Sequence, residues 1–347
     1  MRILIATVRV PFVYGGAEVH AVGLRQALVE AGHQAEIVAI PFKGYPPERI
    51  LDQMLACRLL DLRETAGTPV DRLIGLKFPA YLIPHPRKVI WMIHQHRQAY
   101  DLWQHPLGDL HTYANGADVR MAIHAADAKL LPRSRGLFTV SRNIALRLRT
   151  YCGLNATPLY HPPRDAGRFY TRPAEDFLYF PSRINPLKRQ YLVLEALART
   201  RSQVRICFSG PAEPGLERQC AELARKGGVA NRVRWLGAVS EEEKLDLYAR
   251  SLGVLFPPLD EDYGYITLEA MLAQKPVITC TDSGGPLEFV VHRETGIVAE
   301  PTPESLASAM DDLWDDRERA RQWGDAGRQR YSDLRIDWGN VIENLLQ

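Results

Sequence analysis

The sequence predicts an α/β protein with two domains, each a doubly wound parallel sheet with helices on both faces. Its 347 residues exceed what one hydrophobic core usually serves. Short apolar segments alternate with segments of helical periodicity, as in strand–helix–strand units. The alternation stops in a polar, proline-rich stretch at residues 157–173 and then starts again. We therefore expect this stretch to link two halves of the same kind.

The first half opens with an apolar strand, MRILIAT, and a helix over residues 17–33. Apolar side chains recur at helical spacing in that helix, and Gly32 supplies a C-cap. Further elements are expected as strands at 34–40, 70–77, 88–93 and 136–141 and as a helix at 142–151.

The second half repeats this order. Strands are expected at 176–182, 204–210, 233–237, 253–258 and 276–280, and helices at 190–200, 215–228, 241–251, 266–274 and 304–316. Ligands of such sheets bind at the carboxyl ends of strands, so the cleft between the domains is the expected site. We place the N-terminal domain at residues 1–170 and the C-terminal domain at residues 171–334.

The composition favours an ordinary globular protein of the cytoplasm. The chain is 46% hydrophobic and 24% charged, without a secretion signal or the ~18-residue apolar run that a membrane span needs. Its five cysteines form no Cys-x-x-Cys, which is typical of free thiols in a reducing compartment.

The net charge of +2 conceals an asymmetry, because residues 1–171 carry +8 and the remainder −6. Between Asp127 and Asp165 there is no acidic residue. The basic residues there form either a solvated face or a surface for an anionic membrane or phosphorylated acceptor, where each adds ~1 kcal/mol near anionic lipid. Our hypothesis assigns the second role to Arg142, Arg147 and Arg149. A pI of 8.2 and the lack of a recognition motif argue against nucleic acid.

A basic constellation lies in SRINPLKR. Arg183 follows a strand and Lys188 stands at the start of a helix, a pattern typical of an anion site. Two cations and the ~+0.5 charge of a helix N-terminus nearly neutralise a sugar-nucleotide diphosphate, so we expect neither metal nor cofactor. Asp260 and Asp262 match the Asp-x-Asp pattern that holds Mg²⁺ or Mn²⁺ elsewhere, but three letters are a weak signal.

An acidic constellation lies in EDYGYITLEAM, where Glu261 follows an apolar strand and Glu269 lies one turn into the next helix. Glu269 can accept from ribose hydroxyls or simply complement the helix dipole, and Glu261 can accept from a sugar beyond the phosphates. Gly264 allows close approach of the backbone. The amides expected to face outward at the helix start are those of Tyr265, Ile266 and Thr267.

Together these two segments resemble the retaining glycosyltransferases of family 4, which have the GT-B fold and carry Glu-x7-Glu plus an Arg with a following Lys. The likeness extends over nearly the whole chain: GGAEVHAVGLRQALVEAGHQAEIV resembles the family's Gly-Gly-x-Glu opening, and DSGGPLEFVVHRETGIV its late Gly-Gly-x-x-Glu block. It implies GT-B architecture, with two Rossmann-like domains facing an interdomain cleft and the last helix, within 335–347, crossing back onto the first domain.

The resemblance implies that Gly15 and Gly16 let a first-domain loop approach the donor diphosphate. It implies that Arg183 and Lys188 hold that diphosphate as its charge develops.

For the sugar and the ribose, the resemblance implies that Glu261 orients the donor sugar and Glu269 binds the ribose. His94, or its neighbour His96, corresponds to the family histidine that faces the transferred sugar. The chain departs from the family where Pro181 replaces a usual glycine and where Asp262 and Tyr263 replace Gly-Phe.

The implied activity is that of a retaining, metal-independent hexosyltransferase (EC 2.4). It moves a sugar from a nucleotide-diphosphate donor, UDP favoured over GDP, to an acceptor hydroxyl in polysaccharide, lipopolysaccharide or glycolipid assembly of bacterial type. Expected partners are that donor and a glycan or lipid-linked acceptor, with peripheral contact to the inner face of a membrane. A nucleotide-sugar epimerase of the same fold and a non-catalytic nucleotide- or carbohydrate-binding protein are the alternatives. The Glu-x7-Glu spacing argues against the first, and the presence of Glu261, Arg183 and Lys188 against the second.

Overall fold

The computed structural model describes residues 1–13 and 15–347 and contains two compact units. Unit 1 comprises Met1–Arg164 and Asp337–Gln347, and unit 2 comprises Asp165–Ile336. The chain changes units at 164/165 and 336/337, a few residues from the predicted boundaries of 170/171 and 334/335. The first boundary lies earlier because Arg168, which precedes residue 171, already donates to Glu242 of unit 2.

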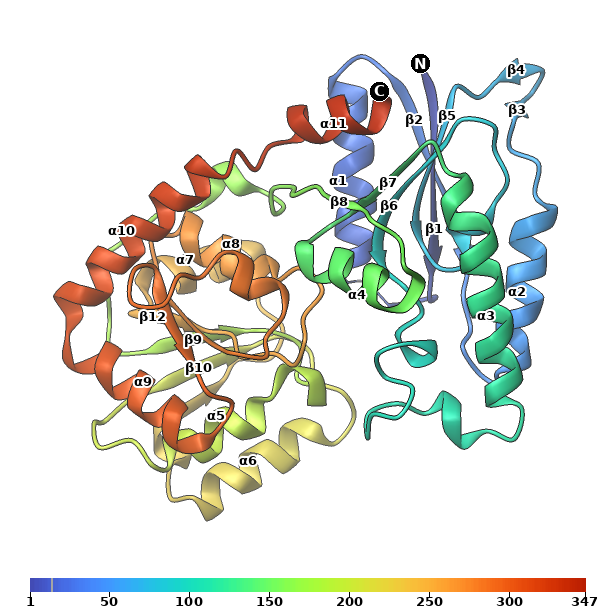
Figure 1. Ribbon diagram of the computed structural model, residues 1–347. Coiled ribbons are helices and arrows are strands. Elements are labelled where there is room, and N and C mark those ends of the chain that lie inside the picture. Colours follow the sequence, from blue (N-terminus) through green and yellow to red (C-terminus); the bar gives the residue numbers. More distant parts are fainter. Residues whose placement is uncertain (14) are drawn as a thin grey trace. The chain divides into compact units, whose positions relative to one another are not determined.

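Unit 1 is built on a six-stranded parallel sheet with the order β2-β1-β5-β6-β7-β8 (Figure 1). Helices α1 and α11 lie on one face of this sheet, and α2 and α3 on the other (Figure 1). The strands are β1 (Arg2–Arg9), β2 (Gln34–Pro41), β5 (Arg72–Lys77), β6 (Lys88–His94), β7 (Gly136–Thr139) and β8 (Thr157–Pro158), beside a hairpin of β3 (Glu64–Thr65) and β4 (Thr68–Pro69). The helices are α1 (Gly16–Glu30), α2 (Glu48–Leu59), α3 (Gly116–Leu130), α4 (Arg142–Cys152) and α11 (Trp338–Leu346).

The terminal helix α11 packs onto unit 1. Trp338 lies against Gly23 of α1, where an added Cβ would come within 2.8 Å of the indole ring. Its ring also meets that of Trp91, a fully buried residue of β6, at 6.3 Å. Arg72 at the start of β5 donates to the last three carbonyls of the chain, which fixes the end of the helix.

Unit 2 has a six-stranded parallel sheet with the order β11-β10-β9-β12-β13-β14. Helices α5, α6 and α9 lie on one face, and α7, α8 and α10 on the other (Figure 1). The strands are β9 (Leu178–Pro181), β10 (Ile206–Ser209), β11 (Val233–Trp235), β12 (Gly253–Leu255), β13 (Val277–Cys280) and β14 (Gly296–Ala299). The helices are α5 (Gln190–Leu197), α6 (Leu216–Lys226), α7 (Glu241–Arg250), α8 (Tyr265–Leu272), α9 (Pro303–Asp315) and α10 (Arg317–Asp333).

The order of unit 2 reverses between β9 and β12, because β10 and β11 continue to one side and β13 and β14 to the other. In open parallel sheets, the crevice outside the carboxyl ends of strands at such a reversal is where ligands bind. Since β9, β12 and β13 are neighbours, the loops that follow them meet at that edge. This places two sequence motifs, SRINPLKR and EDYGYITLEAM, side by side.

Candidate active site

The loops after β9, β12 and β13 are joined by their backbones. Leu259 donates to the carbonyl of Leu187 at 2.8 Å, and Glu261 donates to that of Ser283 at 3.0 Å. The Glu261 carbonyl in turn accepts from Gly285 at 2.8 Å. The backbone of Glu261 is therefore held on both sides by the loop that carries DSGG, and Leu259 ties the same segment to the loop that carries SRINPLKR.

Lys188 and Glu261 form an ion pair across the reversal point, with the Lys188 ammonium donating to Glu261 Oε2. The two residues are 73 positions apart in sequence, and their side chains are 19% and 24% exposed. The ammonium also lies 5.2 Å from the ring centroid of Phe256, and Asn185 Oδ1 accepts from the Lys188 amide at 3.1 Å. Two residues predicted from separate motifs therefore contact each other.

Arg183 lies on the same loop with an exposed side chain. Among the described residues, none is paired with its guanidinium, whereas its carbonyl accepts from Gln190 Nε2 at 3.0 Å. Gly210 allows this loop to pass close to the end of β10, because an added Cβ there would lie 2.4 Å from the Ser182 carbonyl. The backbone of Arg183 is held while its side chain stays available to an anion.

Glu269 lies one turn into α8 and is 9% exposed. Tyr248 donates its hydroxyl to Glu269 Oε2 at 2.6 Å, and Lys244 donates to Oε1 at 3.3 Å. Burial, and then the Glu269 charge, raise the pKa of Tyr248 well above its ordinary value, so it remains a donor. Burial opposes the charge of Lys244, but Glu269 and Glu241 outweigh it and raise the pKa of Lys244. Two side chains of α7 therefore orient the Glu269 carboxylate. An acid that only complemented the dipole of α8 would not need them.

The start of α8 requires glycine, since Gly264 has φ +89° and an added Cβ would lie 3.0 Å from Pro286 Cγ. Tyr265 and Ile266 begin the helix and are half-buried. Thr267 corrects the prediction: it is fully buried, and its amide donates to the Gly264 carbonyl at 3.0 Å. Its amide therefore does not face outward, because it closes the first turn.

One ion pair at this edge was missed. Arg189 donates to both carboxylate oxygens of Asp282, at 2.7 and 2.6 Å, and is 9% exposed. It takes the left-handed backbone conformation with φ +59°, which turns its side chain toward the loop after β13. Burial opposes its charge, yet Asp282 raises the pKa of Arg189. The only signal in the sequence was position, because Arg189 follows Lys188 and Asp282 opens DSGG.

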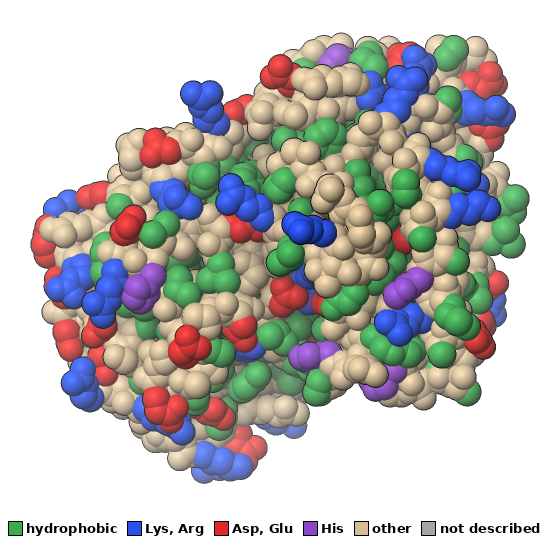
Figure 2. All heavy atoms as spheres, in the orientation of Figure 1, with side chains coloured by type: hydrophobic (Ala, Val, Ile, Leu, Met, Phe, Trp, Pro, Cys, Tyr) green, Lys and Arg blue, Asp and Glu red, His purple; other side chains and the backbone are tan. Residues whose placement is uncertain are grey.

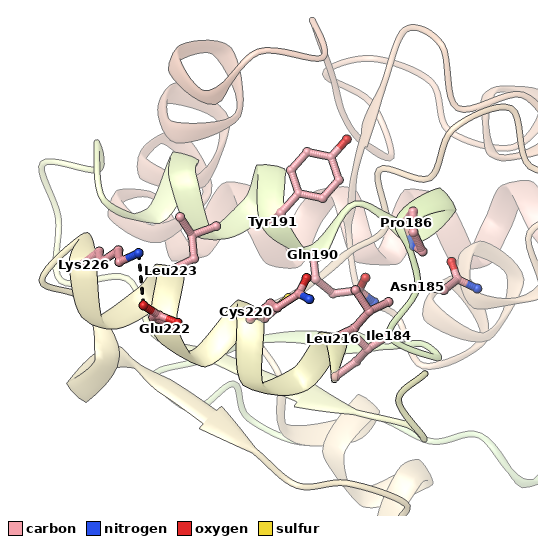
Figure 3. Close-up of a pocket in the computed structure, with 11 residues that line it drawn as sticks. Ile184, Asn185, Pro186, Gln190, Tyr191, Leu216, Cys220, Glu222, Leu223 and Lys226 are labelled. Atoms are coloured by element: carbon pink, nitrogen blue, oxygen red, sulfur yellow. Dashed lines mark ion pairs between the residues drawn. The ribbon is translucent and has the colours of Figure 1, made fainter. Parts of the chain in front are cut away.

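A cavity of about 450 Å³ lies beside this edge, between α5 and α6 (Figure 3). Ile184, Asn185 and Pro186 line it from the loop that carries Arg183 and Lys188. Its remaining wall is largely apolar, with the ion pair of Lys226 and Glu222 at 3.1 Å. Neither Arg183 nor Lys188 is among the residues that line it, so it is separate from the charged site.

In unit 1, the predicted residues follow β1 and β6. Gly15 donates its amide to Glu18 Oε2 at 2.9 Å, and Gly16 begins α1. His94 ends β6 with its Nδ1 2.6 Å from the Gln95 carbonyl. The ring of His96 lies tilted against that of Phe78, with centroids 5.3 Å apart. Burial, followed by the charges of His94 and Lys77, lowers the pKa of His96 to about 4. Both imidazoles are half-buried at the carboxyl edge of the sheet.

The predicted basic surface needs one correction, because Arg147 is buried, with 8% exposure. It falls between Ile144 and Leu148 on the packed face of α4, whereas Arg142 and Arg149 are exposed. The residues between Asp127 and Asp165 also do not form one surface, because they run from the amino edge of the sheet through β7 into α4.

Across residues 1–13 and 15–347, no helix is both long and apolar enough to cross a membrane. No three His, Cys, Asp or Glu residues of these ranges are grouped to hold a metal ion.

Residues 168–330, nearly all of unit 2, match the family described as glycosyl transferases group 1. A similar protein is the alpha-1,3/1,6-mannosyltransferase ALG2 of Dictyostelium discoideum, 32% identical over 139 residues, which are 38% of this chain and 33% of that protein. The O-antigen chain mannosyltransferase C of Escherichia coli is 26% identical over 185 residues, 52% of this chain and 48% of that one. The chain thus spans between a third and a half of the length of these curated relatives.

Among solved structures, the sucrose-phosphate synthase of Thermosynechococcus elongatus matches with a TM-score of 0.78 at 17% identity, over 99% of this chain and 97% of that one. Anabaena Alr3699/HepE, solved with UDP-glucose, matches with a TM-score of 0.73 at 16% identity, over 99% and 98%. These likenesses confirm the predicted fold class: the chain has the GT-B fold of two parallel-sheet domains, and its second domain carries the glycosyl transferase group 1 match.

Proposed function

We propose that the chain is a retaining glycosyltransferase of family 4, which moves a sugar from a nucleotide-diphosphate donor to an acceptor hydroxyl. The observation that carries the proposal is the contact of Lys188 with Glu261 at the reversal point of unit 2. Arg183 stands available on the same loop, and Glu269 is oriented one turn into α8. The family match over this unit supports the class of reaction.

The ion pair gives each partner a role when a donor arrives. Lys188 turns from Glu261 to the diphosphate and, with Arg183, stabilises the charge that develops as the sugar–phosphate bond breaks. Glu261, relieved of its lysine, accepts from hydroxyls of the transferred sugar. The departing diphosphate takes the proton of the acceptor hydroxyl on the same face, so no protein nucleophile is needed and the anomeric configuration is retained.

Glu269 receives the ribose hydroxyls, with Tyr248 and Lys244 holding its carboxylate in place. We favour UDP over GDP as the nucleotide, and a solved neighbour was crystallised with UDP-glucose. The relatives named as mannosyltransferases and as a D-rhamnosyltransferase support a hexose-type sugar. The proposed acceptor is a glycan or a lipid-linked sugar of polysaccharide, lipopolysaccharide or glycolipid assembly, received by unit 1 with His94 or His96 toward the transferred sugar.

Lys188 and Arg183 supply the positive charge that a divalent metal would otherwise bring to the diphosphate, so we propose metal-independent transfer. Activity is then unchanged in excess EDTA. Complete loss that Mn²⁺ or Mg²⁺ restores would instead assign Asp260 and Asp262 to a metal site.

The test of the proposal is mass spectrometry of products formed from UDP-, GDP- and ADP-sugars with mixed glycan and lipid-linked acceptors. We expect sugar transfer from donors of one of the three nucleotides, and we expect Glu261→Gln to abolish it. Glu222→Gln, at an exposed position, is the matched control. The α-anomer as product from an α-linked donor supports retention. Products whose sugar is only epimerised, or nucleotide binding with neither transfer nor hydrolysis, would overturn the proposal in favour of the two alternatives.

A further inference from the structure

Unit 1 contains a cavity of about 560 Å³ at the edge of its sheet opposite to His94. Lys88 begins β6 and lines the cavity, whereas His94 ends the same strand. Seven residues of strand separate the two ends by ~20 Å, so the cavity is distinct from any site near His94. Its walls come from the end of α2, the segment before β6 and the end of α3.

Cations dominate the lining of this cavity. Its charged residues are Arg58, Arg63, Lys88 and Arg133 against the single carboxylate of Asp61. That carboxylate is already paired with Arg63, at 2.5 Å. Three cations therefore face the cavity without an acidic residue of its lining to balance them.

Of these three cations, Lys88 gives the strongest indication of an anion site, because its side chain is buried, with 5% exposure. Its ammonium donates to the carbonyls of Tyr81 and Ile83, at 2.9 and 3.1 Å, so one of its three donors has no partner within residues 1–13 and 15–347. Among the described residues, no carboxylate pairs with Lys88. Burial and then the neighbouring charge of Arg58 lower the pKa of Lys88 to about 8, so it is still charged at neutral pH.

The other two cations are exposed at the rim. Arg58 donates to the carbonyl of Leu82 at 3.1 Å, and Arg133 has no ion pair within the described part of the chain. Capping of the carbonyls at residues 81–83 accounts for the bonds of Lys88 and Arg58. It accounts neither for Arg133 nor for the open volume that all three cations face. Burying a charge without a counter-ion is costly, and a bound anion would remove that cost.

We propose that this cavity binds a phosphate-bearing anion, with Lys88 at its base and Arg58 and Arg133 at its rim. The ligand is a phosphomonoester or diphosphate group, either of a soluble molecule or of a lipid headgroup at a membrane surface. The site does not depend on the proposed transfer reaction, because it lies in the other unit from the diphosphate loop and uses none of its residues.

The test measures pyrophosphate binding by calorimetry at low salt, with UDP binding measured in parallel. We expect Arg58→Ala and Arg133→Ala each to weaken one class of pyrophosphate site about tenfold, or ~1.4 kcal/mol, without changing UDP affinity. Arg49→Ala, an exposed change on the same helix, is the matched control. Equal pyrophosphate affinity in the wild type and both variants, or no site beyond the one that UDP displaces, overturns the proposal.

Sedimentation with phosphatidylglycerol and phosphatidylcholine vesicles distinguishes the two sources of the anion. Binding to the anionic vesicles that Arg133→Ala reduces and pyrophosphate competes away indicates a lipid headgroup. Pyrophosphate binding without vesicle binding indicates a soluble phosphorylated ligand.

Discussion

Lys188 of unit 2 follows a parallel strand and Lys88 of unit 1 begins one, but their charges are balanced in different ways. Lys188 is paired with Glu261, whereas the partners of Lys88 in the described part of the chain are two carbonyls. The difference extends to other buried groups. In unit 2, Arg189 is paired with Asp282 and Lys244 with Glu269.

In unit 1, the buried side chains of Lys88, Asp127 and Arg72 have neutral partners. Asp127 is fully buried and accepts from the hydroxyls of Tyr81 and Tyr100, at 3.0 and 2.8 Å. Buried Arg72 donates to carbonyls at the chain end. Two exceptions are the half-buried ion pair of Arg97 and Asp101 in unit 1 and buried Lys275 in unit 2, which donates to the Arg172 carbonyl at 3.2 Å. The surface of unit 2 agrees with its buried ion pairs, because acidic and basic side chains alternate on the face that Figure 2 shows.

The contrast separates two uses of charge. An ion pair such as that of Lys188 and Glu261 can exchange partners with a substrate that offers both an anion and hydroxyls. A buried charge with neutral partners cannot exchange in this way. Its protonation shifts instead, or it recruits a counter-ion from solution.

The largest expected effect tests the exchangeable pair. Lys188→Met and Arg183→Ala should each lower kcat/KM ~100-fold, or ~3 kcal/mol, because each removes a charged donor from a developing anion. Arg183→Ala should leave the melting temperature unchanged, since its side chain is exposed. Lys226→Ala, an exposed lysine of α6, is the control in steady-state kinetics. Normal turnover in both variants would mean that SRINPLKR is only a surface turn.

Sequence alone predicted the two sheets because apolar strands alternate with amphipathic helices. It gave no assignment to α10 (Arg317–Asp333), where the buried positions are small rather than apolar. At Gly324 an added Cβ would lie 2.1 Å from the Gln274 carbonyl, so close backbone packing replaces hydrophobic periodicity. Helices α2 and α3 and strand β14 were also left unassigned.

For the site, sequence identified the charged residues but not their contacts. The pair of Lys188 and Glu261 depends on the neighbouring positions of β9 and β12, which strand order decides and local pattern does not. Arg147 could have been placed correctly, because Ile144, Arg147 and Leu148 share the spacing of a buried helix face. The prediction instead relied on the number of basic residues between Asp127 and Asp165, which does not show which face of a helix each one occupies.

Asp127 provides the second test, on stability. Burial raises the pKa of Asp127 from its usual value near 3.8 to about 7, although Tyr100 and Tyr81 favour the charged form. Between pH 4 and pH 7 the folded protein therefore keeps a proton that the unfolded chain releases, so its free energy of unfolding falls as pH rises. Relative to Asp127→Asn, which cannot titrate, the wild type should lose roughly 2 kcal/mol between pH 5 and pH 7 in denaturant titrations. A difference that stays constant over that range would place a carboxylate, not a carboxylic acid, between the two tyrosines.

Tyr248 tests whether an oriented carboxylate matters for the nucleotide. Tyr248→Phe removes a hydrogen bond to Glu269, which should weaken UDP binding about tenfold, the equivalent of ~1.4 kcal/mol. The effect should be smaller for 2′-deoxy-UDP, because that ligand lacks one of the hydroxyls that Glu269 would accept from. Tyr191→Phe, an exposed tyrosine of α5, is the control in calorimetric titrations. An equal loss for both nucleotides would indicate a general loosening of the fold and not a weaker ribose contact.

The smallest expected effect concerns α4, where exposed and buried arginines lie on one helix. Arg142 and Arg149 share an exposed face with Leu146, which is 60% exposed, whereas Arg147 is buried. If this face meets an anionic membrane, Arg142→Gln and Arg149→Gln should each lower co-sedimentation with phosphatidylglycerol vesicles by at most ~1 kcal/mol, with little change in melting temperature. Arg147→Gln should do the reverse, because its stem is packed in the unit 1 interior and its loss disturbs packing first. The effect of the exposed pair should fade as salt rises, since screening limits the reach of exposed charges to ~8 Å at physiological ionic strength. If neither Arg142→Gln nor Arg149→Gln changes vesicle binding at low salt, this face does not contact the membrane. That outcome would favour an acceptor that is not membrane-bound.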